Sequence, residues 1–165
     1  MFELGQNVVY GVHGVCQIIG TEERKLDGQI VTYFVLEPVN HQGARYYIPV
    51  HNPAALAKLR PLITPEELDQ LLHSNAVRQN CWTEDENQRK RLYRELIVSM
   101  DRQRVLQMVF TLHQRRKKLI EAGRKMHQCD ENFLSDAEKL LSDEFACVLQ
   151  IPVHAVDSYI AAMFE

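Results

Sequence analysis

The chain has 165 residues, enough for one large domain or for two small ones with separate cores. With 45% hydrophobic and 25% charged residues, its composition is that of a globular protein and excludes a largely disordered one. The sequence contains no run of about 20 apolar residues, and its start lacks the basic and apolar regions of a signal peptide. We therefore expect a cytoplasmic protein with no membrane partner.

The formal net charge is −3, but the charge is unevenly distributed along the chain. Residues 89–125 carry twelve basic and three acidic side chains, whereas residues 126–165 carry one basic and eight acidic side chains. A freestanding DNA-binding domain is usually basic overall, because counterion release supplies most of its affinity. The pattern therefore excludes a typical sequence-specific repressor and indicates one local basic surface. We expect the acidic C-terminal helices to face away from any DNA.

The first fifty residues are typical of β-strands. The segments NVVY, GVCQIIGTEERKL, QIVTYFVLEP and ARYYIPV are rich in β-branched and aromatic residues. Asp27-Gly28 separates two of them and predicts a hairpin turn. Short strands punctuated by glycines predict a small SH3-like or Tudor-like β-barrel.

After Pro49 the pattern becomes helical. We predict a short helix with Pro53 in its first turn, then a helix with Thr64 as N-cap, Pro65 at N1 and Glu67 completing a capping box. Thr83 and Glu86 repeat the capping-box spacing and predict a helix that runs to about Val98. Further helices are predicted from Asp101 to Gly123, over about 130–149, and after Pro152. The fold class is therefore α+β: a barrel domain at 1–55 and an all-α bundle of about five helices at 64–165.

Motifs for catalysis are missing from the sequence. It contains no phosphate-binding loop, no dinucleotide-binding glycine motif, no HExxH and no nucleophile elbow. The four cysteines are scattered, without the close pairs of a zinc site or a disulfide framework. His127 and Cys129 could supply two metal ligands, but no second pair accompanies them. We expect no enzyme activity, no cofactor, no metal and no small-molecule substrate.

Trp82 is the only tryptophan, and it lies in a polar stretch just before a helix that begins with a basic run. One interpretation is structural: the ring folds back onto the following helix as a hydrophobic staple. The other is functional, because minor-groove binders insert apolar wedges between base steps while basic neighbours hold the phosphates. Arg89, Lys90 and Arg91 would be those neighbours.

Several segments, in this order, resemble the CarD/CdnL family of bacterial RNA polymerase-binding transcription regulators. They are FELGQNVVYGVHGVCQI, YFVLEP, YYIPVHN, the lone tryptophan with DENQRKRLYREL, RVLQMVFTLHQRRKKL and DAEKLLSDEFACVL. The resemblance spans nearly the whole chain. The family shares its N-terminal barrel with the transcription-repair coupling factor, which also needs a helicase motor with a phosphate-binding loop that this sequence lacks.

The resemblance implies a mechanism. In the family, the barrel binds the β subunit of RNA polymerase by adding its sheet edge to an exposed strand of that subunit. The resemblance places Arg24 and Tyr47 at this contact, and other members carry arginine at the position of Tyr47. The helical domain meets the minor groove of promoter DNA, such as that of ribosomal RNA genes, at the upstream edge of the melted region. Trp82 is then the wedge that stabilises the open complex. The sigma factor is a further candidate partner, and the protein would join the nucleoid through polymerase.

Two other classes of protein stay open at this point. A protein-interaction adaptor would use the barrel and the helices for two protein partners, without direct DNA contact, and would bury Trp82. A metal protein or barrel-containing enzyme would use the region around His127 and Cys129.

Overall fold

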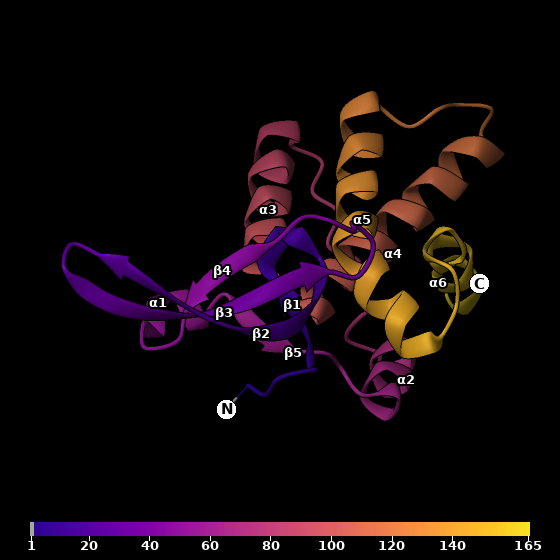
Figure 1. Ribbon diagram of the computed structural model, residues 1–165. Coiled ribbons are helices and arrows are strands. Elements are labelled where there is room, and N and C mark those ends of the chain that lie inside the picture. The colour runs from indigo at the N-terminus through magenta and orange to yellow at the C-terminus, as the bar shows by residue number, and fades with distance from the viewer. Residues whose placement is uncertain (1) are drawn as a thin grey trace. The chain divides into compact units, whose positions relative to one another are not determined.

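The computed structural model describes residues 2–165, which form two compact units that divide between Ile63 and Thr64. The first unit contains a five-stranded antiparallel sheet and the second contains five α-helices, so the predicted α+β class is confirmed (Figure 1). The elements of the first unit are β1 (Asn7–Tyr10), the 3-10 turn η1 (Gly11–His13), β2 (Val15–Leu26), β3 (Gln29–Pro38), β4 (Tyr46–Pro49), α1 (Pro53–Leu56) and β5 (Leu59–Pro61). Those of the second are α2 (Pro65–His73), α3 (Glu86–Ser99), α4 (Arg102–Glu121), α5 (Gln128–Leu149), the 3-10 turn η2 (Val153–Ala155) and α6 (Val156–Met163).

The sheet has the strand order β4-β3-β2-β1-β5. All five strands contribute to one buried cluster, which comprises Val8, Cys16, Ile18, Leu36, Ile48 and Leu59. Neighbouring strands lie about 4.8 Å apart, so a flat sheet would hold its two edge strands far from each other. A shared core therefore indicates a sheet that curls around its interior, as in a small barrel. The first unit extends beyond residue 55, because β5 pairs with β1.

The β2–β3 hairpin projects from the sheet as a long ribbon, visible in Figure 1. Its turn is Asp27-Gly28, as predicted, and both residues have positive φ, 50° and 82°. These values suit the two-residue hairpin turns whose twist matches that of the strands. A β-bulge lies between Ile18 and Gly20, where β2 advances two residues while β3 advances one. Because side chains alternate between faces, the bulge reverses which residues of β2 point toward the core.

Local capping explains where the helices of the second unit begin and end. The Thr64 capping box is present, with the Glu67 N–H donating to the Thr64 hydroxyl at 3.1 Å and the Thr64 N–H donating to the Glu67 carboxylate at 3.1 Å. Asp101 caps α4 as predicted. Gly123, at φ 71°, ends α4 in a Schellman motif, because its N–H bonds to Ile120 and the next N–H bonds to Leu119. The predicted helix to about Val98 is present as α3, but its predicted Thr83 cap is wrong: the N-cap is Asp85, whose carboxylate accepts the Gln88 N–H at 2.9 Å.

Helices α4, α5 and α6 supply most of the buried residues of the second unit, including Leu112, Leu134, Phe145 and Ile160. Within residues 2–165, no single helix is long and apolar enough to cross a membrane. The pair Gln128–Leu149 and Val153–Met163 has the length and composition of a broken span, bent by 109°, but core helices of globular proteins share those properties.

Candidate functional site

Arg24 and Tyr47, which were predicted to share one surface, are in contact in the structure. The Arg24 guanidinium carbon lies 3.9 Å from the centroid of the Tyr47 ring, and Glu22 accepts a hydrogen bond from Arg24 Nε at 3.3 Å. Tyr33 packs against Tyr47 edge to face, with centroids 6.5 Å apart. About half of the Arg24 side chain is exposed. The result is a cation–aromatic cluster that is open to a partner.

The bulge in β2 is what places Arg24 on this face. Before the bulge, Cys16 and Ile18 point into the core. With unbroken alternation Arg24 would point the same way, but the extra residue in β2 turns it to the opposite face, where Tyr33 and Tyr47 lie. The glutamate beside Arg24 raises the pKa of its guanidinium, so the cation is permanent.

Strand β4, which carries Tyr47, forms one edge of the sheet. Val50 donates its N–H to the Thr32 carbonyl at 3.0 Å, and hydrogen-bonded pairs alternate along an antiparallel ladder. Ile48 therefore bonds to β3, whereas the N–H and C=O of Tyr47 point away from β3. Pro49 has no N–H to offer on that side. The edge thus presents a short backbone pairing site next to the Arg24–Tyr47 cluster.

In the second unit, Trp82 lies in a segment without regular secondary structure, directly before α3. Its ring is half-buried, and two guanidinium groups lie over it: the guanidinium carbon of Arg89 is 4.1 Å from the ring centroid and that of Arg115 is 4.6 Å from it. The indole Nε1 is shielded from solvent and has no hydrogen-bond partner within the described chain. Trp82 is therefore neither a free exposed wedge nor a core residue; it is covered by cations.

Arg89 was predicted to contact DNA, but the structure places it inside the helical unit. It is 5% exposed and pairs with Asp130 of α5, with Nε–Oδ1 at 3.0 Å and Nη2–Oδ2 at 3.3 Å. Its Nη1 donates to the Thr83 carbonyl at 2.8 Å. Every nitrogen of the guanidinium therefore has a partner within the protein, and the structure gives no support to a direct phosphate contact by Arg89.

Lys90 and Arg91 follow Arg89 on α3 but point elsewhere. Successive helical residues are rotated by about 100°, so Arg91 lies on nearly the opposite side of the helix from Arg89 and Trp82. Arg91 is exposed. Lys90 forms an ion pair with Glu86 at 3.0 Å, which raises the pKa of Lys90 and lowers that of Glu86. Both cations remain at the surface, where a phosphate can reach them.

A hollow of about 250 Å³ adjoins Trp82 and was not predicted. Its lining carries both signs of charge: besides Arg89, it has the cations Arg115 of α4 and Arg124 and Lys125 of the connection between α4 and α5, and the carboxylates Glu84, Glu86 and Asp130. Arg124 and Lys125 reach this place because the left-handed Gly123 reverses the chain at the end of α4. The end of α4 at Gly123 was predicted from the sequence. The sequence did not predict that Trp82 shares a hollow with Arg124 and Lys125.

The strong charge polarity of the sequence has a structural explanation. The acidic helix α5 packs against α3 and α4, and three ion pairs connect them. They are Arg89–Asp130, Arg102–Glu144 and Arg116–Glu131. The acidic helix therefore neutralises the inward cations of the basic segment. The cations beside Trp82 and those on the outer sides of α3 and α4 are not neutralised by these three ion pairs, and they can bind an anionic partner.

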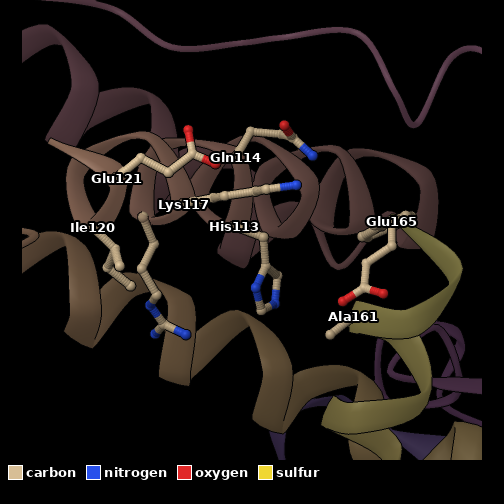
Figure 2. Close-up of a pocket in the computed structure, with 9 residues that line it drawn as sticks. His113, Gln114, Lys117, Ile120, Glu121, Ala161 and Glu165 are labelled. Atoms are coloured by element: carbon tan, nitrogen blue, oxygen red, sulfur yellow. The ribbon is translucent and has the colours of Figure 1, made fainter.

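A second hollow, of about 450 Å³, lies between α4 and α6 (Figure 2). His113 and Lys117 line it together with the carboxylates of Glu121 and Glu165. Its lining carries both signs of charge, as does that of the hollow beside Trp82, so charge alone does not distinguish the two. Among residues 2–165 no group of three or more His, Cys, Asp or Glu is placed to hold a metal ion.

The first unit is, by its fold, a small β-barrel module with one aromatic and cationic face beside a free sheet edge. Residues 2–63 match the family described as the CarD-like/TRCF RID domain. The family is one of RNA polymerase-interacting domains without enzymatic activity. No curated protein matches the chain.

Proposed function

We propose that the protein is a transcription regulator that binds the β subunit of RNA polymerase through its first unit. The β4 edge would pair with an exposed strand of the polymerase, since β-strand addition gives affinity through main-chain hydrogen bonds. Tyr47 lies on β4, and the Arg24 side chain reaches its ring from β2, so these two side chains would supply specificity. The observation that carries this proposal is the family match of residues 2–63.

The second unit would then meet promoter DNA at the upstream edge of the melted region. Trp82 would insert into the minor groove and hinder closing of the bubble, while basic side chains hold the phosphates. Lys90 and Arg91 stay in this set from the sequence prediction, and Arg115, Arg124 and Lys125 join it because they surround Trp82. Arg89 instead holds the tryptophan from inside.

Tethering accounts for DNA binding by a chain of net charge −3. Attachment to polymerase raises the local concentration of the helical unit near the promoter to roughly millimolar. A weak and sequence-indifferent contact then suffices. The same attachment would bring the protein to the nucleoid and near the sigma factor.

A photo-crosslinker at position 82 tests this proposal. In the variant Trp82→p-benzoylphenylalanine, ultraviolet light should link the protein to promoter DNA at the upstream edge of the bubble, and only when cognate polymerase is present. The same variant carrying Arg24→Glu should lose the DNA crosslink, because it no longer binds polymerase.

The alternative is a protein-interaction adaptor with no direct DNA contact. The observation that favours it is the cover over Trp82, whose ring has the guanidinium groups of Arg89 and Arg115 over it. For an adaptor, position 82 would crosslink to protein or to nothing, and never to DNA.

A further inference from the structure

We propose that the buried Arg89–Asp130 ion pair is a positioning element, which holds the Trp82 ring in a set orientation before DNA binds. This inference rests on the proposed function, because it assigns to the pair the presentation of the wedge. The two side chains are only 6% and 2% exposed, and two parallel hydrogen bonds join them.

Arg89 joins three parts of the helical unit at a single guanidinium. One edge binds Asp130 of α5, Nη1 binds the carbonyl of Thr83, and the flat face covers the ring of Trp82 at 4.1 Å. Thr83 is the residue that follows Trp82 in the chain. The same group therefore holds both the backbone next to the tryptophan and the face of its ring.

Asp130 sets the plane of that guanidinium. A bidentate carboxylate fixes both the position and the rotation of an arginine fork, which a single hydrogen bond cannot do. Since the guanidinium carbon lies over the Trp82 ring at 4.1 Å, the position of this group limits the orientations that are open to the ring. The backbone before Trp82 is held by α4, because the Cys81 N–H donates to the Thr111 hydroxyl at 3.0 Å, and the Trp82 N–H donates to the Asn80 side chain at 2.7 Å. These bonds hold the main chain and do not contact the Trp82 ring.

Arg115 differs from Arg89 in ways that suit a contact exchanged during binding. It covers the ring at 4.6 Å, but its Nε is shielded from solvent and has no partner within residues 2–165. A phosphate beside the hollow can compete for Arg115, whereas Arg89 stays held by Asp130. DNA can thus remove Arg115 from the ring while Arg89 keeps its contact.

The test uses Asp130→Asn and Arg89→Lys, with Glu131→Gln as the matched control. Asparagine keeps the shape of Asp130 but directs an amide against the guanidinium, and lysine keeps the charge of Arg89 but cannot form the fork. Glu131 is the next residue of α5 and pairs with Arg116 at 2.6 Å, so its change removes a neighbouring ion pair that does not touch Trp82.

The first readout is acrylamide quenching of the free protein, in which Trp82 is the sole tryptophan. Both test variants should raise the quenching constant at least twofold while the far-ultraviolet circular dichroism stays helical, and Glu131→Gln should leave it unchanged. The inference is overturned if quenching stays at the wild-type value in a folded test variant, or if the control raises it equally. Arg89→Lys decides the matter if Asp130→Asn does not fold.

The second readout is the lifetime of the open promoter complex with cognate polymerase. The test variants should lose most of the prolongation that the wild type gives, while their affinity for polymerase stays within twofold. A wild-type lifetime with either test variant contradicts the positioning role. If the wild type itself has no effect on the lifetime, the proposed function fails, and the quenching result still decides whether the pair positions the ring.

Discussion

The edge of β4 offers the sharpest test of how the first unit binds its partner, through a comparison of Tyr47→Ala with Tyr47→Pro. Alanine removes the ring that contacts Arg24 but keeps the backbone N–H. Proline removes the ring and the N–H together. The Tyr47 N–H points away from β3, so neither change takes a hydrogen bond from the sheet itself.

The expected magnitudes follow from these contacts. Truncation of an aromatic interface residue to alanine costs about 1 kcal/mol of binding free energy when the ring contacts the partner, so Tyr47→Ala should weaken polymerase binding by roughly three- to tenfold. An added strand that loses one main-chain bond gives up about 1 kcal/mol more, and the proline ring also obstructs the neighbouring bonds. Tyr47→Pro should therefore bind at least about tenfold more weakly than Tyr47→Ala.

The assay is the dissociation constant for the cognate polymerase core enzyme, measured by biolayer interferometry with the two variants and the wild type. Circular dichroism of each variant checks that the sheet is intact. Equal affinities of folded Tyr47→Pro and Tyr47→Ala would show that the partner does not pair with β4. The Arg24–Tyr47 face would then bind through side chains alone.

Three further predictions concern the helical unit. Thr64→Ala removes the capping box of α2 and should lower the free energy of unfolding by about 1 kcal/mol in urea titrations, and an unchanged midpoint would contradict this. Arg91→Ala and Lys125→Ala should each reduce the slope of log DNA affinity against log salt by about 0.9, measured with polymerase bound; an unchanged slope would exclude a phosphate contact. Burial and a hydrogen bond to Asp157 raise the pKa of Glu138 to about 7. The folded state therefore favours the neutral carboxyl, and the stability that this preference contributes is lost as the pH rises from about 4.5 through 7. At pH 8, Glu138→Gln should therefore have a free energy of unfolding about 1 kcal/mol higher than the wild type, a value discounted for solvent screening. This difference should shrink toward pH 5, and a difference that stays constant with pH would refute the reasoning.

Those parts of the fold that depend on neighbouring residues could be predicted from the sequence. The Asp27-Gly28 turn, the Thr64 box, the Asp101 cap and the Gly123 ending each need only a few adjacent residues, and all four are present. The start of α3 could not be settled in this way. The Thr83–Glu86 spacing predicted a capping box, but Asp85 caps the helix, and the Thr83 carbonyl accepts a hydrogen bond from Arg89.

The candidate sites depend on contacts between residues that are far apart in the sequence. Arg24 meets Tyr47 because of the bulge at Ile18–Gly20. Gly20 is a residue type that often marks a bulge, but the strand register that results from the bulge could not be read from the sequence. Arg89 was assigned to DNA because it belongs to a basic run. Its true partner, Asp130, is 41 residues away on another helix, so charge pattern alone could not reveal it.

The most direct test of the central claim is the lifetime of the open complex on a ribosomal RNA promoter, with cognate polymerase and either the wild type or Trp82→Ala. A stabilisation of about 1.4 kcal/mol corresponds to a tenfold longer lifetime, within the range of one stacked aromatic and a few phosphate contacts. The account predicts that the wild type prolongs the lifetime several-fold and that Trp82→Ala loses most of this effect while it still binds polymerase. A lifetime that neither protein changes, or that both prolong equally, would contradict the wedge and favour the adaptor.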